Sequence, residues 1–110
     1  MTQRYSVRIL KSAEADLIEI LVYIEQNGSP GESDHVLALI TEQLESLSHL
    51  PDRGHKVPEL SEVKLNQFSE VHQDKFRFIY EVREGAVFIH AILDSRRKLQ
   101  DLLFNRLMRS

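Results

Sequence analysis

The sequence predicts an α+β fold in which a helical hairpin packs on a mainly antiparallel β-sheet. Along the chain, the spacing of apolar residues changes from three or four positions to alternate positions. The first spacing is typical of helices with one buried face and the second of half-buried strands. A short strand precedes the helices, and helical spacing returns over 96–109. The expected order is therefore β-α-α-β-β-β-α, with a C-terminal helix.

The first half contains the elements of the hairpin. Residues 5–10 alternate as a strand, and Ser12 is predicted to cap a helix that ends at Asn27-Gly28. Glu14 and Asp16 in its first turn suit the helix dipole. Ser29-Pro30 is predicted to begin a second helix that stops at Pro51. Each helix carries an apolar stripe: Leu17, Ile20, Leu21 and Ile24 in the first, and Leu37, Ile40, Leu44 and Leu47 in the second.

The second half is predicted to form three strands. The first covers 63–72 and turns at Gln73-Asp74. The second, 75–82, is the strongest, because its alternate residues place one apolar row on one face. Glu84-Gly85 predicts a hairpin turn, and 86–93, which is apolar on both faces, is expected to be a central strand. The shared apolar row of the second strand consists of Phe76, Phe78, Tyr80 and Val82.

Length and composition limit the classes of protein to which this chain can belong. The 110 residues predict a single domain, 1–110, and the absence of cysteine excludes disulfides and zinc–thiolate sites. The longest apolar run, 20–24, is far too short to span a membrane. Because the N-terminus also has no apolar signal region, we expect a cytoplasmic protein without a membrane partner.

Charge is unevenly distributed along the chain. The net charge is −3, but residues 1–60 carry −5, whereas 95–110 carry five basic residues against Asp101 alone. Proteins that bind phosphate backbones usually have a strong basic excess, and this chain has none overall. Only its C-terminus could therefore meet an acidic surface.

Four segments, taken together and in order, resemble the ParE/RelE toxin superfamily. They are Ala-Glu-Ala-Asp-Leu at 13–17, Pro-Asp-Arg-Gly with Val-Pro-Glu-Leu at 51–60, Phe-Arg-Phe-Ile-Tyr-Glu-Val at 76–82, and the segment 91–99 with its paired arginines. The resemblance covers nearly the whole chain. It implies a RelE/ParE-like fold and the toxin of a type II toxin–antitoxin system, of the plasmid-stabilisation kind. A cognate antitoxin would neutralise the toxin and could form a hetero-oligomer with it.

The target implied by the resemblance differs between two branches. ParE-like members inhibit DNA gyrase by protein binding, whereas RelE-like members cut messenger RNA in the ribosome. The Val-Pro-Glu-Leu loop and the arginine pair resemble ParE more closely. Ser69 stands where many members have arginine, and Asp94 where many have histidine. A relative without toxicity therefore stays open as an alternative, as does a RelE-like endoribonuclease.

The nuclease alternative would need a base, an acid and a cation for the phosphate. The residues that could fill these roles are Glu59, His90 (or His72) and Arg77. A simpler interpretation makes Glu59 a surface loop residue, His90 a core histidine and Arg77 a structural or partner-binding residue. The lysine cluster and the C-terminal aromatic acid/base of many RelE-like toxins are missing. We therefore expect an inhibitor rather than an enzyme.

The residues expected to contact the target or the antitoxin are basic. They are Arg77, Arg96, Arg97, Lys98, Arg106 and Arg109. No metal site is expected, because His35, His49 and His55 have no metal-ligand spacing with one another or with carboxylates. No cofactor is expected either, because the four glycines are isolated and form no phosphate loop.

Overall fold

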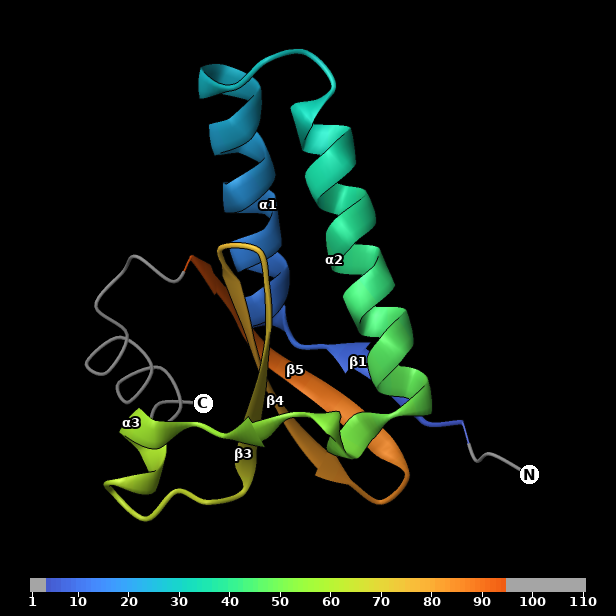
Figure 1. Ribbon diagram of the computed structural model, residues 1–110, viewed down its shortest axis with the longest axis vertical. Coiled ribbons are helices and arrows are strands. Elements are labelled where there is room, and N and C mark those ends of the chain that lie inside the picture. Colours follow the sequence, from blue (N-terminus) through green and yellow to red (C-terminus); the bar gives the residue numbers. More distant parts are fainter. Residues whose placement is uncertain (1–3, 95–110) are drawn as a thin grey trace.

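The computed structural model describes residues 4–94 and confirms the predicted α+β fold. Two long helices cover one face of a five-stranded sheet with strand order β1-β5-β4-β3-β2 (Figure 1). The β1–β5 pair is parallel and the remaining pairs are antiparallel. The helical elements are α1 (Lys11–Asn27), α2 (Glu32–His49), η1 (Pro51–Arg53) and α3 (Pro58–Ser61). The strands are β1 (Ser6–Ile9), β2 (His55–Lys56), β3 (Phe68–Gln73), β4 (Phe76–Arg83) and β5 (Ala86–Asp94).

The start of α1 differs from the prediction because a distant contact replaces a local cap. Leu10 occupies the N-cap position, and Ser12 lies inside the helix. The Ser12 hydroxyl donates to the carbonyl oxygen of His90 at 2.8 Å. Asp16, expected to interact with the helix dipole, is buried and accepts a hydrogen bond from the Ile92 N–H at 3.0 Å. Both polar side chains therefore attach α1 to β5.

The start of α2 was predicted two residues too early. Ser29 and Pro30 lie in the connection, and Gly31 occupies the N-cap position with φ +88°. Glycine adopts this left-handed conformation without steric cost. Glu32, the first helical residue, accepts a hydrogen bond from the Ser29 N–H. The glycine therefore determines where the chain turns into α2.

The strand predicted over 63–72 was also too long, because β3 begins only at Phe68. The chain before it forms the unpredicted β2 and α3 and then folds back. Leu65 N–H donates to the Leu60 carbonyl at 2.8 Å, and Lys64 has φ +65°. Burial of Leu60 drives this compact turn, which periodicity along the chain does not reveal.

The two C-terminal strands agree closely with the prediction. β5 lies between β1 and β4, as expected for a strand that is apolar on both faces. The hairpin turn has positive φ at Glu84 (48°) and Gly85 (79°), as a type I′ turn requires. The predicted apolar row of β4 faces the helices: Phe76, Phe78 and Tyr80 are buried there, and Val82 packs beside them. The preceding turn begins one residue later than predicted, at Asp74, which has φ 56°.

A buried tyrosine connects this core to the chain after α2. The Tyr80 hydroxyl donates to the Pro51 carbonyl at 2.7 Å and accepts from the Gly54 N–H at 3.1 Å. Burial raises the pKa of Tyr80, so the hydroxyl stays protonated at neutral pH.

We expect Tyr80→Phe to reduce the free energy of unfolding by about 1–2 kcal/mol, because two backbone groups lose their partner. Urea unfolding measures this loss. Tyr23→Phe, at an exposed tyrosine of α1, is the control and should change stability little. An equal effect of the two substitutions would show that the Tyr80 hydroxyl bonds contribute nothing.

Within residues 4–94, no helix is long and apolar enough to cross a membrane. The predicted C-terminal helix over 96–109 lies outside the described residues. The same holds for five residues expected to bind a partner: Arg96, Arg97, Lys98, Arg106 and Arg109.

Candidate functional site

The candidate site lies on the sheet face opposite the long helices. Side chains alternate between the faces of a strand, so Phe68, Glu70 and His72 of β3 share this face with Arg77 and Ile79 of β4. A second apolar cluster covers part of the face and includes two residues contributed by the α3 region. Its buried members are Val57, Leu60, Phe68, Ile79, Ala91 and Leu93. The polar residues therefore lie beside a small core rather than in open solvent.

Arg77 is held between two carboxylates. Its Nε donates to Glu70 Oε1 at 2.6 Å, and its Nη2 donates to Glu70 Oε2 at 2.9 Å. Towards α3, Nη1 donates to Glu59 Oε2 at 2.8 Å and Nη2 to Glu59 Oε1 at 3.0 Å. Each carboxylate thus receives a bidentate pair of bonds, which is the strongest geometry for such an ion pair.

Burial differs between the partners and determines how much each depends on the ion pair. Glu70 is almost completely buried, with 1% of its side chain exposed, whereas Glu59 is 26% exposed. A carboxylate as buried as Glu70 needs a paired cation to remain charged. Arg77 therefore stabilises Glu70 inside the fold, and Glu59 closes the cluster on its more exposed side.

The ion pair shifts the ionisation of its members. The Arg77 hydrogen bonds hold the pKa of Glu59 below its ordinary value, although partial burial opposes this. The Glu59 hydrogen bond likewise raises the pKa of Arg77, against a lowering by burial. Both groups are consequently charged at neutral pH. Counted formally, two carboxylates and one guanidinium give the three residues a net charge of −1.

The lowered pKa of Glu59 predicts an acid-dependent loss of stability. An acid with a depressed folded-state pKa contributes stability above its unfolded pKa, here about 4.5, and loses it as the pH falls through the folded value. Glu59→Gln should therefore be less stable than the wild type at pH 6, with the difference shrinking below pH ~4.5.

Urea unfolding between pH 3 and pH 6 tests this expectation. Glu25→Gln, at an exposed position of α1, is the matched control and should follow the wild-type curve. A constant difference between wild type and Glu59→Gln at every pH would contradict the role of the Glu59 charge.

Two histidines extend the cluster at the sheet edge. His72 Nε2 lies 2.7 Å from Glu70 Oε1, and His55 Nδ1 lies 3.9 Å from Glu70 Oε2. Both imidazoles are exposed, by 65% for His55 and 50% for His72. His55 reaches Glu70 because the two residues are partners in the β2–β3 register. The buried Glu70 carboxylate therefore has two exposed imidazoles on its solvent side.

His90 does not join Arg77 and Glu59. Its Nε2 lies 3.1 Å from Glu81 Oε1, and its ring meets Phe68 edge-on at 4.9 Å. Burial lowers the pKa of His90, although the Glu81 hydrogen bond opposes this, so the ring is neutral at pH 7. Glu81 is four residues from Arg77 along β4, which corresponds to about 13 Å. Of the nuclease candidates, the structure thus brings together Arg77, Glu59 and the alternative acid His72, which is the β3 partner of Arg77, whereas His90 lies apart.

The partner that sequence reasoning overlooked is Glu70. As a single charged residue within a predicted strand, it gives no local signal of burial or pairing. The alternation Glu70-Val71-His72 places a carboxylate and an imidazole on one strand face. This alternation is the signal in the sequence from which a polar cluster could have been inferred. The expectation that Glu59 is only a surface loop residue does not describe its bidentate contact with Arg77.

Solved structures with the same architecture are toxin–antitoxin complexes. The chain is similar to a chain of the chromosomal ParDE system from P. aeruginosa, with 18% identity, a TM-score of 0.67 and coverage of 84% of this chain and 97% of that chain. It is also similar to a chain of the RelBE2 complex from Mycobacterium tuberculosis, with 20% identity, a TM-score of 0.63 and coverage of 86% and 94%. These likenesses define the class of fold as ParE/RelE-like.

The sequence model described as the ParE toxin of the type II toxin–antitoxin system parDE matches residues 7–99. The chain therefore belongs to the ParE toxin family. No curated protein sequence matches it. The superfamily resemblance expected from the four motifs is confirmed.

Proposed function

We propose that this ParE-family toxin inhibits DNA gyrase by protein binding and is neutralised by a cognate antitoxin. The observation that carries the proposal is the engagement of Arg77 by Glu59 and Glu70. Four of the five guanidinium N–H groups donate to carboxylates, and the cluster has a net negative charge. Such a cluster repels a phosphate, whereas RNA cleavage requires cations that stabilise the negative charge developing on the phosphate.

The basic C-terminal segment supplies the proposed contact with the target. Residues 95–110 combine Arg96, Arg97, Lys98, Arg106 and Arg109 with a single acidic residue on a chain of net charge −3. A cationic segment of this kind favours association with an acidic protein surface.

An antitoxin partner is supported by an uncovered apolar strip on α1. Ile18, Val22 and Tyr23 are 56%, 45% and 62% exposed. Such a strip suits an apolar partner segment, including one that folds on binding. The related solved structures are complexes of toxin with antitoxin, which agrees with this proposal.

The second candidate function is a RelE-like endoribonuclease acting on messenger RNA at the ribosome. The contact between Arg77 and Glu59 favours it, because a base and a cation adjoin one another. In that case RNA would have to displace the Glu59 carboxylate from the guanidinium before either residue could act.

A gyrase supercoiling assay tests the proposed function. Purified protein should block supercoiling, and Arg96→Ala/Arg97→Ala should raise the concentration needed by roughly tenfold, because it removes two charges from the proposed interface. Arg4→Ala/Arg83→Ala removes the same charge elsewhere and should leave inhibition unchanged. Uninhibited supercoiling at high protein excess would exclude gyrase as the target.

A further inference from the structure

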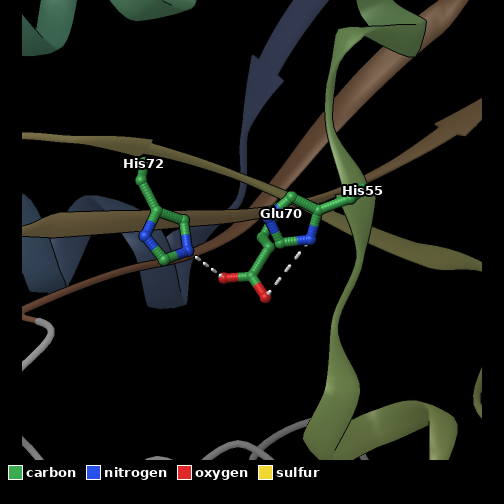
Figure 2. A group of neighbouring side chains, drawn as sticks. All are labelled: His55, Glu70 and His72. Carbon is green, nitrogen blue, oxygen red and sulfur yellow. Dashed lines mark hydrogen bonds and ion pairs between the residues drawn. The ribbon is translucent and has the colours of Figure 1, made fainter.

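A group of potential metal ligands lies at the edge of the sheet, beside the Arg77 ion pairs. Figure 2 shows His55 of β2 and His72 of β3 on either side of the Glu70 carboxylate. One ligand atom from each of the three residues can be chosen so that all lie within 4.8 Å of one another. The three residues span positions 55 to 72 of the sequence, and the β2–β3 pairing brings them together.

We propose that His55, Glu70 and His72 bind a divalent transition-metal ion, with Zn²⁺ as the preferred ion. Two imidazole nitrogens and one carboxylate oxygen are a common protein ligand set for zinc. Imidazole ligands favour zinc and its neighbours in the transition series, whereas Mg²⁺ and Ca²⁺ prefer oxygen ligands. The proposal does not depend on whether gyrase is the target.

The separations of the candidate ligand atoms bracket the spacing expected around a tetrahedral ion. Ligand atoms about 2.1 Å from a tetrahedral ion lie about 3.4 Å apart. The separations of His72 Nε2 and His55 Nδ1 from the Glu70 oxygens are 2.7 and 3.9 Å, on either side of that value. Binding would replace the hydrogen bond between His72 and Glu70, and a contact of His55 Nδ1 with the Lys56 carbonyl at 3.0 Å.

The surrounding charges support this site. Arg77 fixes the orientation of the Glu70 carboxylate with two hydrogen bonds, as residues behind metal ligands commonly do. The positive charge of Arg77 is offset by Glu59 on its other side, so Glu59, Glu70 and Arg77 together still carry −1. An incoming cation therefore meets a net negative cluster.

Exposure of the two imidazoles gives the ion access from solvent. His55 and His72 are half-exposed or more, whereas Glu70 forms the buried floor. Three protein ligands leave the fourth tetrahedral position of zinc for water or for a group from a partner. The bound ion would connect the two-residue β2 to β3.

Isothermal titration of untagged full-length protein with Zn²⁺ tests the proposal. We expect one ion per chain, and an affinity at least tenfold lower for His55→Ala and for His72→Ala, because loss of a ligand should cost at least as much as loss of a residue behind one. Both positions are exposed, so these variants should fold. His35→Ala, at an exposed histidine of α2, is the control and should bind like the wild type.

Two further readouts identify the ligands. Co²⁺ should give visible absorption bands of a four- or five-coordinate ion in the wild type, and these should be lost in both variants. Zn²⁺, but not equimolar Mg²⁺, should raise the melting temperature of the wild type and the control. Absence of stoichiometric Zn²⁺ binding, or binding that neither His55→Ala nor His72→Ala weakens, would overturn the proposal.

Discussion

Arg77→Ala should lower the free energy of unfolding by roughly 3–5 kcal/mol, the range for removing one partner of a buried ion pair. Most of the loss comes from Glu70, which would remain 1% exposed without its bidentate cation. Glu59, which is 26% exposed, can turn to water and should contribute less. Chemical denaturation of the purified variant measures the loss.

Two further variants define the origin of that loss. Arg83→Ala is the matched control, because this arginine is 58% exposed and lies 3.5 Å from Glu81. Exposed pairs contribute up to about 1 kcal/mol. The double variant Arg77→Leu/Glu70→Leu should recover much of the stability, because no unpaired charge remains buried. A loss below about 1 kcal/mol for Arg77→Ala would mean that Glu70 does not need its partner.

Gly54→Ala should be the second most destabilising change, at roughly 2–3 kcal/mol, the upper part of the typical range for overpacking. The backbone of Gly54 (φ −79°, ψ 177°) is accessible to any residue, so conformational freedom is not the reason for glycine here. An added Cβ would instead collide with the Tyr80 hydroxyl and the Glu70 carbonyl oxygen. The carbonyl belongs to β3 and cannot move without displacing the strand.

The two collisions can be separated. Gly54→Ala in a Tyr80→Phe background removes the hydroxyl but leaves the Glu70 carbonyl in place. The alanine should therefore cost less in that background, yet still destabilise. Thermal and urea unfolding of the four proteins give the coupling between the two sites. An alanine that is tolerated in both backgrounds would show that the chain after α2 adapts without penalty.

Local sequence patterns were sufficient to predict the helical hairpin and the strands β4 and β5. The apolar row of β4 and the Glu84-Gly85 turn are short-range signals that tertiary contacts reinforce. The start of α1 was not predictable in this way, because Ser12 prefers the His90 carbonyl, 78 residues away, to a local cap. The region of β2 and α3 was missed because burial of Leu60 decides its course.

The candidate site was only partly visible in the sequence. Arg77 and Glu59 were recognised as residues that could act together, and they are in contact. Their link to Glu70 depends on the pairing of His72 with Arg77 between β3 and β4, and the link to His55 depends on β2. Neither strand register can be deduced from spacing along one chain. Side-chain clusters that form across neighbouring strands could therefore be identified only from the structure.

The central claim is that Arg77 serves the fold and that the toxin acts by binding a protein. One comparison tests it most directly: wild-type protein is assayed in parallel for gyrase supercoiling and, by primer extension, for cleavage of translated messenger RNA. The account predicts blocked supercoiling and intact messenger RNA. Cuts at the ribosomal A site that a folded Glu59→Gln variant no longer makes, with supercoiling unaffected, would contradict it.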